Sequence, residues 1–198
     1  MRRARDQRGF SLAEVLVSTV IALWLALILH EFHRAVSRSV WAQEQRSQAQ
    51  QIARVAADLM ARELRVAGYG GNGVALATLR VAAPDQVEVQ ADLNGDGDTA
   101  DANEIVGYRY DPTKQALMRS TGGGSPQPLV DHVPSGAFSL LYRDGAGTPL
   151  TGTLDAAARA QVREVEIHLG VEFPADPTQQ RTVLVTHIER VQLRNAGL

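Results

Sequence analysis

The sequence predicts an α+β fold in which one long N-terminal helix packs on an antiparallel β-sheet domain. Two observations carry this prediction. Neither proline nor glycine occurs between Phe10 and Ala67, and apolar residues in the second half of this stretch recur at separations of three and four, which is the period of a helix. Beyond the glycines that follow, the pattern changes to strand-length apolar or alternating segments separated by Pro, Gly and Asp.

Charge is distributed unevenly along the chain. The 198 residues carry 20 Lys and Arg against 22 Asp and Glu, for a net charge of −2. Residues 1–9 alone hold four arginines and one aspartate, so the rest of the chain is acidic. A single lysine and an acidic surface argue against nucleic-acid binding, which needs a basic face. Cysteine is absent, which excludes disulfides, thiol catalysis and Cys-ligated zinc.

An apolar run of twenty residues extends from Phe10 to Leu29. At about 1.5 Å per residue, this length crosses a bilayer core of roughly 30 Å, and the basic flank keeps the N-terminus cytoplasmic. A cleaved secretory signal would have a shorter run and a small-residue cleavage site, whereas this run ends in His30 and Glu31. Glu14 is the one ionisable side chain in the run. Because a charge in hydrocarbon costs about 3 kcal/mol, we expect Glu14 to have a partner.

The segment GFSLAEVLV at residues 9–17 resembles the class III signal of type IV pilins and pseudopilins, in which a basic leader ends in Gly before Phe and a Glu stands fifth after the cut. The resemblance implies that residues 1–9 are a leader. It further implies that a prepilin peptidase cuts between Gly9 and Phe10 and methylates the new Phe10 amine, and that Glu14 pairs with the N-terminal ammonium of a neighbouring subunit. The alternative is that Glu14 stabilises its own helix N-terminus or snorkels to the interface.

The helix is expected to continue well past the membrane. Residues 10–30 form the membrane-spanning or filament-core part, and residues 31–68 form an amphipathic part that continues into the soluble domain, in which Ile52 to Leu64 should lie against a sheet. Gly68 is suited to end the helix in the left-handed conformation. The stretch that ends the helix, RELRVAGYGG at residues 62–71, is similar to that of PilW-type minor pilins and J-type minor pseudopilins.

Residues 69–198 are expected to form a β-rich domain, which together with the long helix is the pilin-like plan that the resemblance implies. Short connections favour antiparallel pairing. The predicted strands are 86–93, 104–110, 115–120, 137–144, 162–173 and 182–193. A helical turn capped by Asp155 is expected at 154–161, and a surface loop at 120–128.

An acidic stretch, DLNGDGDTADANE at residues 92–104, suggests a calcium site. Its oxygen-bearing side chains stand at positions 1, 3, 5 and 7 with Gly97 at position 6, as at the start of an EF-hand, although the twelfth position is Asn103 rather than Glu. Hard oxygen donors suit Ca²⁺ better than zinc or copper. The expected ligands are Asp92, Asn94, Asp96 and Asp98, with Asp101 or Glu104 completing the shell. The alternative is a solvated turn without metal.

Enzyme activity is not expected. The sequence contains no nucleophile elbow, no zinc-protease motif and no P-loop, and the glycines at 68, 70 and 73 follow a helix instead of a strand, which excludes a dinucleotide site. The five histidines are dispersed. His30 and His33 share a helix face where the helix should leave the membrane, and His168 and His187 lie on separate predicted strands that could bring them together.

The resemblance implies a minor pilin that helps to initiate or cap a type IV pilus. The alternatives are a J-type minor pseudopilin of a type II secretion system, or an anchored adhesin or DNA-uptake pilin. The implied partners are other minor and major pilins through the N-terminal helix, the prepilin peptidase and the inner-membrane assembly platform. The implied location is the bacterial inner membrane, crossed once, with the C-terminal domain in the periplasm until the subunit enters a filament.

Overall fold

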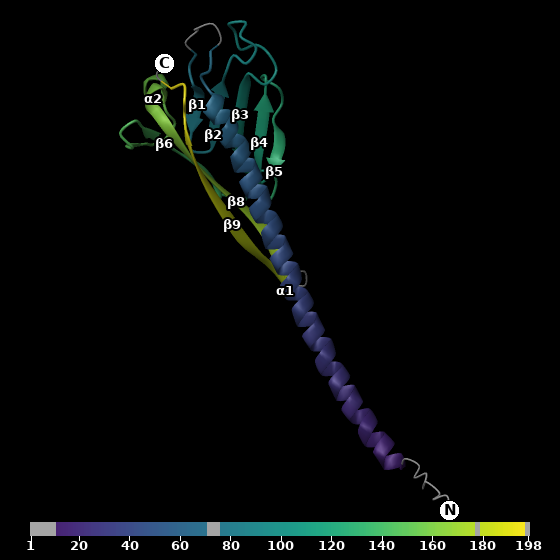
Figure 1. The fold of residues 1–198 in the computed structure, drawn as a ribbon. Helices are drawn as coiled ribbons and strands as arrows, with labels where there is room; N and C mark the ends of the chain where they lie inside the picture. Colours follow the sequence, from purple (N-terminus) through teal and green to yellow (C-terminus); the bar gives the residue numbers. More distant parts are fainter. Residues whose placement is uncertain (1–10, 71–75, 177–178, 197–198) are drawn as a thin grey trace, which may run out of the picture. The chain divides into compact units, whose positions relative to one another are not determined.

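The computed structural model describes residues 11–70, 76–176 and 179–196. The first element is helix α1, Leu12–Val66. The chain divides into two compact units, Met1–Gln43 and Glu44–Leu198, so the second unit takes in the C-terminal part of α1 together with all the strands (Figure 1). The predicted uninterrupted helix is therefore confirmed, and each unit is described by itself below.

The first unit is the N-terminal part of α1. No part of this unit buries the apolar side chains of the helix, so they are exposed. Among the described residues, α1 is the one helix that is long and apolar enough to cross a membrane. The large exposed apolar residues here are Leu12, Val15, Leu16, Val17, Val20, Ile21, Leu23, Trp24, Leu25, Leu27, Ile28, Leu29, Phe32, Val36 and Val40. Such a continuous apolar surface must be covered by lipid or by another protein.

In the second unit, α1 packs through a face made mainly of alanine. The buried residues of the helix are Ala49, Ala53, Ala56, Ala57, Met60, Ala61 and Leu64. All of these side chains except that of Ala57 belong to the apolar core that the helix shares with both sheets. The expectation that Ile52 to Leu64 lies against a sheet is correct for Met60 and Leu64 and wrong for Ile52 and Val55, which are 47% and 60% exposed. The helix turns its alanines inward and leaves these two larger aliphatic side chains outside.

The helix ends at Val66, and Gly68 follows in the left-handed conformation that the sequence predicted for it. The backbone φ of Gly68 is +76°, in the left-handed region, and a Cβ at this position would lie 2.6 Å from Oγ1 of Thr78. The Gly68 N–H donates to the carbonyl of Gln90 at 2.8 Å, which ties the end of the helix to the second strand. Conformation and space therefore both require glycine here.

The strands form two antiparallel sheets. The first has the order β1-β2-β3-β4-β5, and the second has the order β7-β6-β8-β9 (Figure 1). The strands are β1 Leu79–Ala83, β2 Gln86–Gln90, β3 Ile105–Asp111, β4 Ala116–Thr121, β5 Gln127–Val130, β6 Phe138–Asp144, β7 Pro149–Leu150, β8 Val162–Asp176 and β9 Gln179–Gln192. Each of the six predicted strands overlaps an observed one, whereas β1, β5 and β7 were not predicted. Part of the predicted loop 120–128 is strand β5.

A second helix, α2, spans Ala156–Gln161 and connects β7 to β8, two strands of the second sheet. Its N-cap is Asp155, whose side chain accepts a hydrogen bond from the backbone N–H of Ala158 at 2.8 Å. The predicted helical turn and its cap are therefore confirmed.

Tyr142 joins the two sheets. It lies on β6, and its hydroxyl oxygen is 2.9 Å from the carbonyl oxygen of Ala83 and 3.2 Å from that of Gln86, so the hydroxyl can donate to either. Both carbonyls lie at the turn between β1 and β2. Burial raises the pKa of this phenol above its usual range. The backbone N–H of Leu140 adds a hydrogen bond to the carbonyl of Pro84 at 2.7 Å. One apolar core, shared by α1 and both sheets, results from this connection.

A charged group fixes the rotation of α1 over the first sheet. Glu63 on α1 accepts hydrogen bonds from the hydroxyl of Tyr108 on β3 and from the guanidinium of Arg119 on β4, with Arg119 Nη2 at 2.5 Å and Nε at 3.3 Å. The bond to Glu63 raises the pKa of Arg119, and burial, followed by the same carboxylate, raises that of Tyr108. Removing Glu63 would leave a largely buried phenol and a guanidinium without their acceptor.

We expect Glu63→Ala to lower the free energy of unfolding by about 2–3 kcal/mol, because a buried donor loses its partner. The matched control is Glu189→Ala, which removes a partly exposed ion pair with Arg65 at 3.5 Å and should cost less than about 1 kcal/mol. Urea unfolding of the detergent-solubilised full chain measures both. Equal losses for the two variants would contradict the special role of Glu63.

Candidate functional site

Glu14 lies in the first turn of α1, where it forms a capping box with Ser11. The backbone N–H of Ser11 donates to Oε2 of Glu14 at 2.9 Å, and the backbone N–H of Glu14 donates to Oγ of Ser11 at 3.2 Å. The spacing S-x-x-E is readable in the sequence as a helix start. The sequence-based alternative, in which Glu14 stabilises its own helix N-terminus, therefore has a definite geometry in the isolated chain.

The capping box does not decide whether Glu14 also acts between subunits. A carboxylate has room for further donors beside the one N–H of Ser11. The predicted cleavage site, Gly9 and Phe10, lies outside the described residues. Both the cleavage and the pairing of Glu14 with a neighbouring ammonium remain predictions.

The acidic loop connects β2 to β3 and is organised by two buried carboxylates. Asp92 accepts from the N–H of Gly95 at 2.6 Å and from that of Gly97 at 3.0 Å. Glu104 accepts from the N–H of Leu93 at 2.9 Å and from that of Asp101 at 3.2 Å. Both carboxylates are buried, and neither forms an ion pair with a cationic side chain in the described part of the chain.

The remaining predicted calcium ligands are exposed and hydrogen-bonded to one another or to the nearby backbone. The side-chain amide of Asn94 donates to Asp96 at 2.9 Å and to Asp101 at 2.6 Å, while Asp98 accepts from the N–H of Ala100 at 2.8 Å. The donor set is all oxygen, which fits calcium chemically. Among the described residues, however, no three His, Asp or Glu side chains are gathered closely enough to hold a metal ion. Calcium binding therefore stays a prediction.

The described histidines do not form a common site. His168 pairs with Ile188 across β8 and β9, and His187 pairs with Leu169, so the two imidazoles lie on opposite faces of the sheet. The sequence left open whether they meet, and the register shows that they do not. His30 and His33 are exposed on α1.

Glu166 is the centre of a charged cluster that sequence analysis missed. Its carboxylate lies 2.6 Å from Nε2 of His168, 2.8 Å from Nε of Arg190 and 3.6 Å from Nη2 of Arg143. The hydrogen bond from His168, with support from Arg190, holds the pKa of Glu166 below its usual range. The four side chains come from three strands, β6, β8 and β9, and only the register of those strands brings them together.

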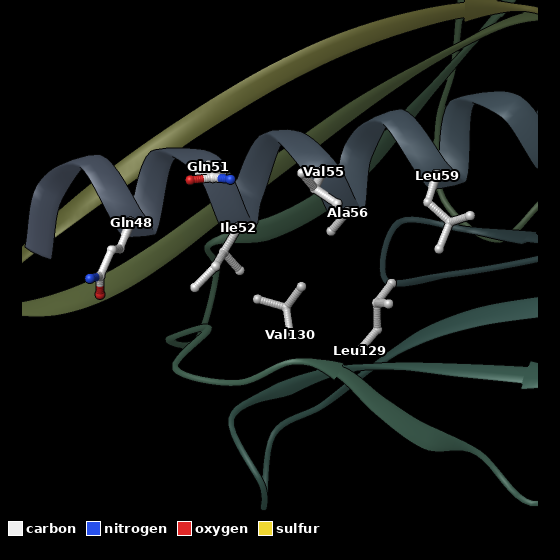
Figure 2. Close-up of a pocket in the computed structure, with 8 residues that line it drawn as sticks. All are labelled: Gln48, Gln51, Ile52, Val55, Ala56, Leu59, Leu129 and Val130. Atoms are coloured by element: carbon white, nitrogen blue, oxygen red, sulfur yellow. The ribbon is translucent and has the colours of Figure 1, made fainter.

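An apolar groove of about 460 Å³ runs between α1 and the edge strand β5 (Figure 2). Ile52 and Leu59 extend from the helix towards Leu129 and Val130 of β5, and Val55 also lines the groove. Gln48 and Gln51 lie at one end of the groove, and Ala56 forms part of its helical wall. The groove exists because the alanine face of α1 turns Ile52 and Val55 away from the core.

Residues 42–189 match the model of the family "Prepilin peptidase-dependent protein B". No curated protein matches the chain. Among solved structures, the chain is similar to a type IV-like pilin from Thermus thermophilus at 16% identity and a TM-score of 0.46, over 75% of this chain and 98% of that one.

We expect Glu166 to make the fold sensitive to acid. Because its pKa is lowered in the folded chain, its contribution to stability is complete above the ordinary glutamate value of about 4.3 and is lost as the pH falls through the lower folded value. The melting temperature of the native chain should therefore fall more steeply below pH 4.3 than that of Glu166→Gln. Thermal unfolding curves of both chains, recorded from about pH 3 to about pH 7, measure the difference. Parallel curves would contradict the assignment.

Proposed function

Since the chain belongs to the prepilin peptidase-dependent protein B family, we propose that it is a minor pilin, a structural subunit that helps to initiate or cap a type IV pilus. Membership of this family makes it a structural protein and not an enzyme. The family match begins at residue 42. The finer role therefore rests on the part of α1 that precedes this residue.

The observation that carries the proposal is the exposed apolar helix with a single carboxylate near its start. Large exposed apolar side chains are frequent in the first unit from Leu12 to Leu29, and Glu14 is the one acidic residue in the first turn of α1. Lipid would cover the apolar side chains of such a helix before assembly, and the same helices of neighbouring subunits would cover them in the filament. In both settings the charge of Glu14 needs a partner, because an unpaired carboxylate in a low dielectric is costly.

Cleavage between Gly9 and Phe10 would supply that partner on a neighbouring subunit. The new ammonium of Phe10 is cationic, and pairing it with Glu14 of the adjacent chain would fix the stagger between two helices. The pairing requires Glu14 to accept a donor in addition to the Ser11 N–H, which a carboxylate can do. The charge of Glu14 would therefore set the axial offset between the helices of adjacent subunits.

The proposed location follows from the same segment. Residues 1–9 are strongly basic and keep the N-terminus cytoplasmic, so the unit Glu44–Leu198 lies in the periplasm until assembly. The proposed partners are the prepilin peptidase, other minor and major pilins through α1, and the inner-membrane assembly platform. The acidic charge of the chain beyond the leader supports no role in nucleic-acid binding.

We expect Glu14→Gln and Glu14→Ala to be processed normally and yet to enter filaments at least tenfold less than the native chain. Glutamine retains a capping side chain but carries no charge, whereas alanine removes both. Comparing the two variants therefore separates charge from capping. Mass spectrometry reports removal of residues 1–9, and immunoblots of sheared pili report incorporation.

Gly9→Val is the control for processing and should leave the leader attached, because a Cβ obstructs the close approach of the peptidase. Normal incorporation of Glu14→Gln would show that capping, not charge, is what assembly needs. A deletion strain with normal pili and impaired protein secretion would instead support the pseudopilin alternative.

We also propose that the loop at residues 92–104 binds calcium. The observation that favours it is the pair of buried carboxylates, Asp92 and Glu104, which accept backbone hydrogen bonds and form no ion pair with a cationic side chain of the residues that the structure describes. Burying two anions together is costly without a compensating charge. Asn94, Asp96, Asp98 and Asp101 would supply further oxygens. The bound ion would contribute charge neutralisation and stiffen the β2–β3 connection.

We expect millimolar calcium to raise the melting temperature of the full chain by about 3–6 °C over the value in chelator, the shift for ligand at about ten times its dissociation constant. The control variant carries Asp96→Asn and Asp98→Asn together and should show no shift. Differential scanning fluorimetry measures both chains. An unchanged melting temperature for the native chain would exclude the site.

A further inference from the structure

The two sheets end in four edge strands, and three of these edges are protected. The edge of β1 receives a hydrogen bond from the N–H of Leu154 to the carbonyl of Ala82 at 2.9 Å, and its register is shifted between Leu79 and Val81. The edge strand β5 has four residues, contains Pro128 and pairs irregularly with β4. The edge strand β7 has two residues. Bulges, proline, short length and coverage are the usual ways in which proteins prevent unwanted strand pairing.

The fourth edge, β9, carries none of these protections over most of its length. It has 14 residues and is the outer strand of its sheet, paired with β8 alone (Figure 1). The register is regular from Thr182 to Gln192, and the described chain makes no other backbone hydrogen bond to this stretch. No proline, lysine or arginine occurs between Thr182 and Glu189, and His187, the one histidine there, lies on the opposite face of the sheet from Leu184 and Ile188. An unprotected edge of this length is a template for an added strand.

The side chains along β9 give the edge a specific pattern. Leu184 and Ile188 lie on the outer face of the sheet and are 49% and 52% exposed, with Thr186 between them. Arg190 follows on the same face, and its side chain is 66% exposed although it also contacts Glu166. In antiparallel sheets, an aliphatic side chain opposite another aliphatic side chain is stabilising, and so is a pair of opposite charges. The edge therefore selects a complementary strand.

We propose that the β9 edge from Thr182 to Arg190 binds an extended segment of a different subunit of the same filament, which adds a fifth strand to this sheet. In the antiparallel orientation, that segment carries an acidic residue opposite Arg190 and aliphatic residues opposite Ile188 and Leu184. The backbone ladder provides affinity, and these three positions provide selectivity. The inference rests on the proposed function for the class of the partner.

A second copy of this chain fits the edge less well. Two β9 strands paired about Thr186 would place Leu184 opposite Ile188, but Arg190 would then lie opposite Thr182 and gain no acidic neighbour. Such a pair is also a closed twofold contact, whereas successive subunits of a filament are joined by open, head-to-tail contacts. The charge of Arg190 and the requirements of a filament therefore both favour a different chain.

The test uses the full chain in detergent and the synthetic peptide Lys-Thr-Glu-Thr-Val-Thr-Thr-Thr-Ile-Thr-Lys as the probe. The native chain should bind the peptide and show slowed amide hydrogen exchange in residues 182–190. Ile188→Lys and Leu184→Lys should each weaken binding at least tenfold. The matched control is Leu141→Lys, which changes a residue 43% exposed on the same face but on the central strand β6, and should alter binding less than twofold.

Replacing the glutamate of the peptide by lysine should weaken binding at least threefold at low salt, because it opposes Arg190 with a like charge. Absence of exchange protection in residues 182–190, or equal binding by Ile188→Lys and Leu141→Lys, would overturn the proposal. A native dimer that Ile188→Lys dissociates would overturn it in favour of a second copy. None of these measurements depends on filament assembly, so their failure is distinct from a failure of the Glu14 variants.

Discussion

The packing of α1 on the two sheets through a buried face that includes five alanines is the constraint on which the rest of the second unit depends. Alanine adds little volume, so both sheets can share one core with the helix backbone. Glu63 then fixes the rotation of the helix, because its carboxylate must reach Tyr108 and Arg119. Once that rotation is set, Ile52 and Val55 have no place in the core and line the groove beside β5 instead.

This arrangement explains which parts of the fold the sequence could predict. The length of α1, its end at Gly68 and the cap at Asp155 depend on local chemistry and were predicted correctly. The buried face was predicted only in part: Met60 and Leu64 are buried as expected, whereas Ile52 and Val55 are not, because hydrophobicity ranks isoleucine and valine above alanine while packing here favours small side chains. Strand β5 was missed because proline at position 128 indicates a loop, although proline is tolerated on an edge strand. The Glu166 cluster depends on the register of β6, β8 and β9, which no local pattern contains.

For the candidate sites too, the sequence predicted what depends on local chemistry and missed what depends on the fold. The sequence identified Glu14 and the acidic loop because each lies within a short motif, and the capping box with Ser11 was also readable there. What the sequence could not supply is the arrangement of the loop, in which Asp92 and Glu104 are buried and their neighbours are exposed. A motif lists the donors, but the backbone decides which of them converge. Calcium binding would therefore have to draw in Asp96, Asp98 or Asp101 beside the two buried carboxylates.

The two units present different kinds of uncovered surface, and the difference suggests a division of labour in assembly. The helix in the first unit exposes large apolar side chains from Leu12 to Leu29, so in the proposed function it would pack against similar helices and discriminate between subunits mainly through Glu14. The edge of β9 offers backbone hydrogen-bonding groups and a fixed order of aliphatic and charged side chains, which would discriminate between partners if the proposed strand addition occurs. A subunit placed at a unique position needs both surfaces. Without a selective contact in the second unit, a helix of general affinity would enter the filament at any level.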